Sequence, residues 1–290
     1  MVGGSNPLTP TIDYTQKKAS LLTISQARFQ RDLLTKFLTS RREGISPRTI
    51  EYYQLCLIPF VNRYEINSDG INSFLANLNC GNGKLNYYKA ITVFVHWLRK
   101  AGYLNDDPLF RVDKPKSAKR ILPSVTTEQV DTLIGIAENL RDKCIISLLA
   151  DSGMRLTEMA NMRPKDIDWR NYTITIIGKG NKQRKAPFTK RSAKLLQSYL
   201  TDDHNSSENI WKMGRYGIQT MLKRLRQNTG IACNAHSFRR GFACNLHRKG
   251  LSTLDIMHLG GWSDLSMVLR YTRSITFEDC LAHYREIELE

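Results

Sequence analysis

The sequence predicts a mainly α-helical protein with one small β-sheet, an α+β fold, divided into two domains. Apolar residues recur at helical spacing in both halves of the chain. A single pair of β-rich runs, 172–177 and 185–188, flanks the turn sequence GKGN. With 290 residues, the chain is long enough to build two hydrophobic cores.

The N-terminal half is expected to be a flexible tail at 1–25 followed by a helical domain at 26–106. The first helix begins near Ala27, and a third short helix covers 67–77. Ser46 is a good N-cap for the second helix, which has Pro47 in its first turn. A fourth helix, 87–101, ends at Gly102. Expected inward-facing residues are Leu55, Ile58 and Phe60 in the second helix and Tyr88, Ile91, Phe94, Val95 and Leu98 in the fourth, as core rather than a base-stacking platform.

A linker is expected at 107–122, because this stretch has prolines, basic residues and little apolar periodicity. The second domain then covers 123–290. Thr126 and Gln129 resemble a capping box at its first helix. A buried helix at 141–151 ends at Gly153, so that Arg155 lies in a turn before the next helix. The basic residues of this linker, which favour contact with phosphate groups, are Lys114, Lys116, Lys119 and Arg120.

The β-rich runs and the helices that follow them carry more basic residues. GKGN predicts a hairpin turn, which places Lys179 on an exposed loop. An amphipathic helix is expected at 215–229 and another at 235–250, where His236 and Arg239 share one face. Further basic residues, which are candidates for contact with the phosphates of a nucleic acid, are Lys182, Arg184, Lys223, Arg224, Arg226 and Arg240.

The composition favours a nucleic-acid partner. The 43 Lys and Arg against 27 Asp and Glu give a net charge of +16, which favours binding to a polyanion. Nucleic acid is the first candidate for this partner and a membrane surface is the second. No apolar run reaches the ~18 residues of a membrane span, and the N-terminus lacks a signal-type apolar core. Six scattered cysteines indicate a reduced compartment, so we expect a cytoplasmic, nucleoid-associated protein.

A zinc site is a weak alternative use of two Cys/His pairs. Cys233 and His236 are three residues apart, as are Cys244 and His247. No knuckle-type turn surrounds either pair. We therefore expect no metal and no other cofactor.

Five residues form a set that can bind a phosphodiester and attack it. They are Arg155, Lys179, His236, Arg239 and Tyr271. Arginines neutralise the non-bridging oxygens with forked donors. A tyrosine can form a covalent phosphoryl-enzyme, and a lysine or histidine can move the protons.

The order and spacing of these residues resemble the tyrosine recombinase (phage integrase) family. Gly153, Arg155 and Glu158 match its G-x-R-x-x-E turn, and residues 177–188 resemble the Xer-type hairpin that carries a lysine. HSFR matches H-x-x-R, and Trp262 stands nine residues before Tyr271. The resemblance covers about residue 28 to 290, and the N-terminal half resembles the family's core-binding (SAM-like) domain. Arg240 stands where many members have a second histidine.

The resemblance implies a mechanism that uses neither metal nor ATP. Arg155, Arg239, His236 and Trp262 would hold the scissile phosphate. Tyr271 would attack it, leaving a 3′-phosphotyrosine and a 5′-hydroxyl. Lys179 would protonate the leaving oxygen and His236 would take the tyrosine proton; the indole N–H of Trp262 can only donate. Glu158 either supports Arg155 or is a surface carboxylate.

The resemblance also implies assembly on double-stranded recombination sites as a homotetramer, with a monomer or weak oligomer when free. The apolar residues in 275–290 form a terminal helix that docks on a neighbouring subunit or folds back on its own domain. Alternative functions are a type IB topoisomerase or telomere resolvase with the same chemistry, and an accessory DNA-binding protein without activity. An RNA-binding protein is a distant third, because no RRM or KH pattern is present.

Overall fold

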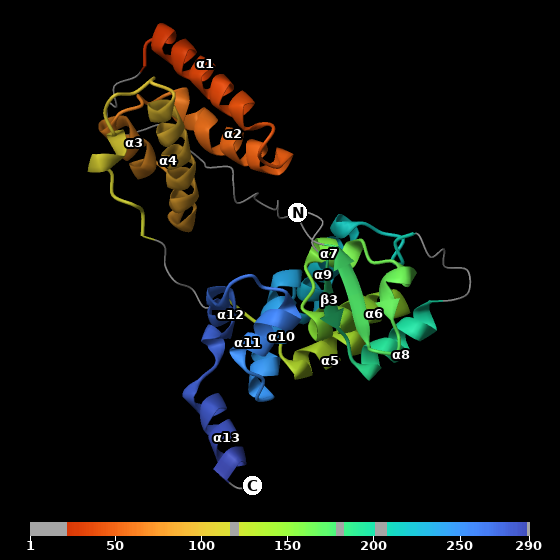
Figure 1. The fold of residues 1–290 in the computed structure, drawn as a ribbon. Helices are drawn as coiled ribbons and strands as arrows, with labels where there is room; N and C mark the ends of the chain where they lie inside the picture. Colours follow the sequence, from red (N-terminus) through yellow and green to blue (C-terminus); the bar gives the residue numbers. More distant parts are fainter. Residues whose placement is uncertain (1–21, 117–121, 178–182, 201–207, 289–290) are drawn as a thin grey trace. The chain divides into compact units, whose positions relative to one another are not determined.

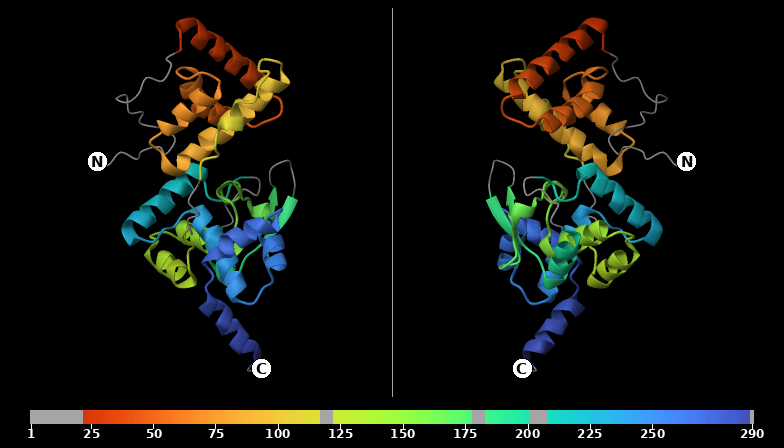
Figure 2. Two further views of the ribbon diagram at one scale, coloured as in Figure 1. Left: turned by 90° about the vertical axis from the view of Figure 1, so that its left-hand side faces the viewer. Right: turned by 90° about the vertical axis from the view of Figure 1, so that its right-hand side faces the viewer.

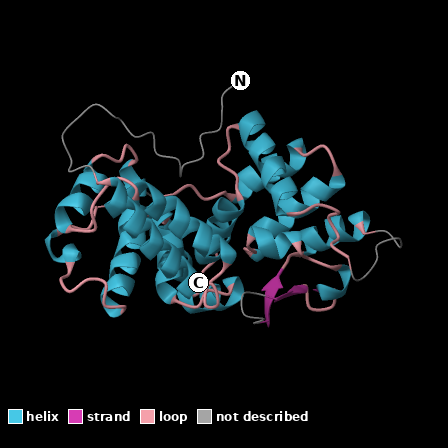
Figure 3. Ribbon diagram, turned by 90° about the horizontal axis from the view of Figure 1, so that it is seen from above, coloured by secondary structure: helices cyan, strands magenta, loops and turns pink. Residues whose placement is uncertain are grey.

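The computed structural model describes residues 22–116, 122–177, 183–200 and 208–288. Helices dominate and three short strands form one sheet, which confirms the predicted fold class (Figure 3). The chain divides into two compact units, 1–119 and 120–290. The exact limits of the expected linker stay a prediction. In the described part of the chain, no helix is long and apolar enough to cross a membrane.

The first unit holds the four helices that the sequence predicts (red to yellow in Figure 1). Helix α1 begins before the predicted start, because Thr23 and Gln26 form a capping box there. The N-cap at Ser46 is confirmed, with its side chain accepting from the N–H of Thr49. The elements are α1 (Ile24–Arg41), α2 (Pro47–Val61), α3 (Ser68–Ala76) and α4 (Lys84–Lys100), with short 3-10 helices at Gly81–Gly83 and Pro108–Arg111.

The core of the first unit is aromatic. Phe37, Phe60, Phe74 and Phe94 are buried, which confirms the prediction that Phe60 and Phe94 are core residues. The predicted inner face of α2 is wrong at two positions, since Leu55 is 47% and Ile58 45% exposed. The buried residues of α2 are Cys56, Leu57, Phe60 and Val61, and the Phe60 ring centroid lies 5.3 Å from that of Phe74.

The second unit is a set of helices with the sheet at one edge. The predicted bounds of α9 are confirmed, whereas α8 and β1 were not anticipated. Strand β2 pairs with both others in antiparallel fashion, with Ile174 opposite Ile167 and Ala186. The GKGN turn lies outside the described residues. The elements are α5 (Thr127–Ile136), α6 (Leu140–Ser152), α7 (Leu156–Ala160), β1 (Ile167–Asp168), β2 (Thr173–Ile177), β3 (Gln183–Pro187), α8 (Lys190–Tyr199), α9 (Arg215–Thr229), α10 (Ala235–Arg248), α11 (Thr253–Gly260), α12 (Leu265–Tyr271) and α13 (Phe277–Glu288).

Helix α6 forms the centre of the second unit and packs against α5, α8 and α10. It ends at Gly153, whose φ of +56° suits glycine, and a Cβ there would lie 2.6 Å from the Phe242 ring. The chain therefore turns sharply just before Arg155. The sheet and α9 lie on opposite sides of this unit (Figure 2).

Candidate active site

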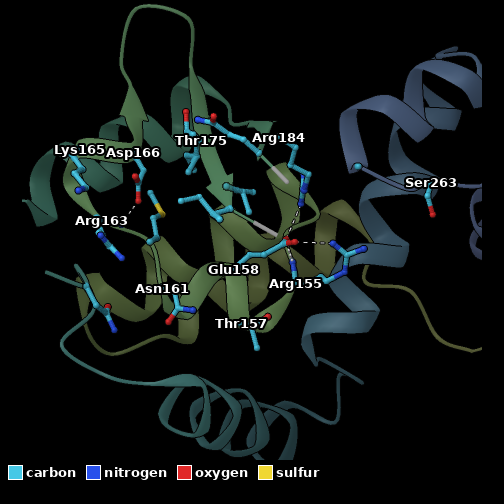
Figure 4. Close-up of a pocket in the computed structure, with 17 residues that line it drawn as sticks. Arg155, Thr157, Glu158, Asn161, Arg163, Lys165, Asp166, Thr175, Arg184 and Ser263 are labelled. Atoms are coloured by element: carbon cyan, nitrogen blue, oxygen red, sulfur yellow. Dashed lines mark hydrogen bonds and ion pairs between the residues drawn. The ribbon is translucent and has the colours of Figure 1, made fainter. Parts of the chain in front are cut away.

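Glu158 lies between two arginines from distant parts of the sequence (Figure 4). Its Oε1 accepts from Arg155 Nη1 at 2.7 Å, and its Oε2 accepts from Arg184 Nη2 at 2.8 Å. The backbone N–H of Arg155, at the N-cap of α7, also donates to Oε2 at 2.7 Å. The Glu158 side chain is only 5% exposed, so it is not the surface carboxylate that the sequence left open.

Glu158 remains ionised in this setting. Burial acts to raise its pKa, but the Arg155 N–H and the Arg184 and Arg155 guanidinium groups outweigh burial, and the pKa of Glu158 is lowered. A carboxylate held by three donors has one fixed orientation. The buried Glu158 carboxylate thereby fixes the position of the Arg155 side chain, which is 48% exposed.

Arg239 is a buried cation on α10. Its Nη1 donates to the carbonyl oxygen of Gly153, and its Nη2 donates to that of Gly260 at 2.8 Å. Burial, and then the positive charges of Arg155 and Arg184, lower its pKa to about 10. That value is far above neutrality, so Arg239 keeps its charge.

Trp262 connects Arg239 with Tyr271. The Arg239 guanidinium carbon lies 4.3 Å from the Trp262 ring centroid, a cation–π contact. The Tyr271 ring centroid lies 5.5 Å from the Trp262 ring centroid, and the two ring planes are inclined at 53°. The buried indole Nε1 of Trp262 has no hydrogen-bond partner among the described residues. This N–H is therefore a donor that the described residues leave unused.

Tyr271 is the last residue of α12 and is half-buried. The thiol of Cys244, on α10, donates to its carbonyl oxygen at 3.3 Å. This contact joins the end of the tyrosine's helix to the helix that carries His236 and Arg239.

His236 lies in the first turn of α10, after the N-cap Asn234. Its ring is exposed, yet the surrounding protein and then the charges of Arg240, Arg239 and Arg155 lower its pKa from the ordinary value of 6.5. A neutral imidazole at pH 7 can accept a proton. His236, Arg155 and Arg239 line one cleft of about 700 Å³.

The basic residues expected to contact DNA have different environments. Lys223 and Arg226 line the same cleft as His236. Arg224 instead faces α6, with Nη2 3.6 Å from the buried Asp142 carboxylate. Arg240 is buried and its Nε donates to the Pro123 carbonyl oxygen at 2.8 Å, so a DNA contact by this side chain lacks support. Lys114 and Lys116 are exposed, while Lys119, Arg120, Lys179 and Lys182 lie outside the described residues.

The Cys/His pairs do not gather into a metal site. The Cys233 thiol donates to the Leu222 carbonyl oxygen at 3.3 Å. Within the described ranges, no group of three or more His, Cys, Asp or Glu side chains is arranged to hold a metal ion.

Sequence reasoning missed the tertiary partners within this site. The two glycine carbonyls that bind Arg239, and the Arg184 contact with Glu158, join residues 21 to 86 positions apart. The glycines at 153 and 260 are the local signal of this packing, but Gly153 was interpreted only as the end of a helix. The helical domain and this cluster of cations beside a tyrosine define the class of a phosphodiester-handling protein with a tyrosine nucleophile.

Comparisons with known proteins agree with this class. The model of the phage integrase family matches residues 123–276, and the chain therefore belongs to that family. Tyrosine recombinase XerA of Thermococcus kodakarensis is 30% identical over 250 residues, which are 80% of this chain and 86% of that protein. Tyrosine recombinase XerD of Halalkalibacterium halodurans is 27% identical, over 67% of this chain and 72% of that protein.

Solved structures share the fold at low identity. The Tn1549 transposon integrase, in complex with transposon right end DNA, has a TM-score of 0.68 and 14% identity and covers 89% of this chain and 99% of that one. A lambda integrase dimer bound to a COC′ core site has a TM-score of 0.66 and 15% identity and covers 85% of this chain and 97% of that one.

Proposed function

We propose that this tyrosine recombinase cleaves and rejoins DNA at specific sites with Tyr271 as its nucleophile. The observation that carries the assignment is the contact of Trp262 with both Arg239 and Tyr271. Trp262 thus contacts both the charged Arg239 and the ring of Tyr271, which supports a phosphodiester site shared by these two residues. Arg155 and His236 complete the phosphate-binding side of the cleft.

The reaction proceeds as two phosphoryl transfers. The Tyr271 phenol oxygen forms a bond to phosphorus while the bond from phosphorus to the 5′ oxygen breaks. His236 takes the phenol proton and Lys179 gives a proton to the leaving oxygen. Arg155, Arg239 and the indole N–H of Trp262 stabilise the charge that develops on the non-bridging oxygens. The 5′-hydroxyl of another strand then reverses these steps and releases Tyr271.

DNA is held along the rest of the protein by basic side chains. Lys223 and Arg226 extend the cleft beside His236. Lys114, Lys116, Lys119, Arg120 and Lys182 are further candidates for phosphate contacts. A cytoplasmic location on the nucleoid fits this substrate.

A homotetramer on two duplexes is the assembly we propose for strand exchange, with a monomer or weak oligomer in the free state. Helix α13 supports a role in assembly because Phe277 is 74% and Tyr284 59% exposed. The helix is also tied to its own domain, since Arg248 Nε lies 2.9 Å from Asp279 Oδ1. Docking on a neighbour therefore involves the apolar side of α13 and leaves this ion pair in place.

The test is covalent trapping of DNA that is nicked near the cleavage site. Wild-type protein is expected to form a covalent adduct on a denaturing gel, and Tyr271→Phe is expected to form none while binding DNA with similar affinity. An accessory DNA-binding protein would give no adduct with either. Exchange of strands between two marked duplexes separates a recombinase from a topoisomerase, which would only relax supercoils. An adduct with Tyr271→Phe would overturn the assignment.

A further inference from the structure

Arg184 was expected to contact DNA, but its guanidinium group turns into the protein. It projects from β3, and its side chain is only 17% exposed. Its Nη2 donates to Glu158 Oε2 at 2.8 Å, and its Nε is buried without a hydrogen-bond partner among the described residues. Figure 4 shows Arg184 and Arg155 approaching Glu158 from two sides. An arginine in this position is poorly placed to reach a phosphate outside.

We infer that Arg184 is a positioning residue, which acts through Glu158 to hold Arg155 in the orientation that binds the scissile phosphate. This inference rests on the proposed function. Glu158 Oε2 accepts from both the Arg155 backbone and Arg184, while Oε1 accepts from the Arg155 side chain. Loss of Arg184 leaves the carboxylate bound only by the backbone N–H and the side chain of Arg155, so its orientation and that of the Arg155 side chain are less constrained.

Arg184 also raises the positive charge around Arg155, to which the buried Arg239 contributes as well. A lone Arg155–Glu158 pair would be neutral and would attract an anion weakly. With Arg184 added, two cations share one carboxylate, and the cluster keeps a positive charge beside the exposed part of Arg155. A phosphate is therefore attracted to Arg155 even though its Nη1 already binds Glu158.

The stem of Arg184 reaches a third part of the site. A Cβ at Gly261 would lie 2.4 Å from Arg184 Cδ, and Gly261 has a φ of +62° in the turn just before Trp262. The aliphatic part of Arg184 thus packs against the turn that sets Trp262, while its head group holds Glu158. One side chain joins β3, the Arg155 turn and the Trp262 turn.

The first experiment separates positioning from DNA binding. Arg184→Gln is compared with two controls. Arg226→Gln removes a proposed phosphate contact. Arg163→Gln changes an exposed arginine that lines the pocket of Figure 4 together with Arg184. DNA affinity, its salt dependence and the single-turnover rate of adduct formation at saturating DNA are measured. Arg184→Gln should lower the rate by about 10²-fold with little change in affinity, because a misplacement of about 1 Å has an effect of this size.

The controls should behave differently. Arg226→Gln should weaken binding and reduce the salt slope by about 1. Arg163→Gln should keep the single-turnover rate. Weaker binding by Arg184→Gln with an unchanged rate at saturating DNA would show that Arg184 contacts DNA and would overturn the inference.

A double-mutant cycle tests whether Arg184 acts through Arg155. Arg155→Lys should slow adduct formation, and adding Arg184→Gln should slow it little further, because the orientation of Arg155 is already lost. Arg184→Lys should recover part of the rate, since it keeps the charge, and it serves as the informative variant if Arg184→Gln unfolds. Fully additive defects would overturn the inference. A wild-type protein that forms no adduct would count against the proposed function instead.

Discussion

The two units of this protein differ in what they bury. In the described part of the first unit, the buried polar side chain is Gln30, whose amide donates to the carbonyls of Val61 and Tyr64 and accepts from the N–H of Ile66. The second unit buries Arg239, Arg240 and Asp142, together with the carboxylate of Glu158. The first core is held together by packing. The second contains charged groups, each of which needs a hydrogen bond or an ion pair with its neighbours.

This difference separates the sources of stability and activity. Buried charges stabilise a fold poorly, because desolvation offsets much of their mutual attraction. Their orientation, however, is tightly set by the groups that pair them. The second unit therefore has a preorganised site at some expense in stability, and three predictions test this comparison.

The largest effect is expected at Arg239. Arg239→Gln removes a charged donor from the phosphate site, and the single-turnover cleavage rate should fall by about 10²–10³-fold. The free energy of unfolding should fall by no more than about 1–3 kcal/mol, the usual effect of leaving buried carbonyls unsatisfied. Urea unfolding measured beside adduct formation checks both, and a rate loss that merely follows the loss of folded protein would contradict the comparison.

The reverse pattern is expected in the first unit. Phe94→Ala should lower that unit's free energy of unfolding by about 3–5 kcal/mol, because the ring is fully buried and stacks on Trp97. Well below the melting temperature and at saturating DNA, the cleavage rate should remain close to that of the wild type. Leu55→Ala, at an exposed position, is the matched control and should change stability by about 0.5 kcal/mol or less. Equal losses of stability in the two variants would show that the aromatic core is not the main source of the first unit's stability.

The smallest effect is a shift in the titration of His236. Burial and the three nearby arginines lower its pKa below 6.5, so NMR titration of the free protein should give a midpoint under that value. Since the folded state has the lower pKa, protons bind the unfolded chain more readily as pH falls through 6.5. His236 therefore reduces stability below that pH and not above it. His236→Gln assigns the resonance, and a midpoint above 6.5 would contradict the positive field proposed for this cleft.

Local signals allowed much of the fold to be predicted from the sequence. The caps at Ser46 and Thr126 and the turn at Gly153 depend on residues within three positions of one another, and all were identified. The buried face of α2 was predicted incorrectly, because the sequence between Leu55 and Phe60 is apolar on more than one face and the packing against neighbouring helices selects one of them. The two-residue strand β1 has no periodicity to detect.

The candidate site was predictable as a set of residues but not as a network. Arg155, His236 and Arg239 were identified from their motifs, and the structure brings all three to one cleft. Charge alone could not distinguish Lys223 and Arg226, which line that cleft, from Arg224, which faces Asp142. The roles of Arg184 and Arg240 depend on partners 26 and 117 residues away, which no local pattern reveals.

The stacking of Arg239 on Trp262 gives this protein an optical reporter at its candidate active site. The emission of an indole responds to the charge and solvent around the ring, and here a guanidinium and a phenol contact the same ring. A phosphate that binds Arg239 or the free indole N–H changes that surrounding directly. The difference in emission between the wild type and Trp262→Phe isolates this signal from the three other tryptophans. Occupancy of the site can thus be followed in real time without a label on the DNA.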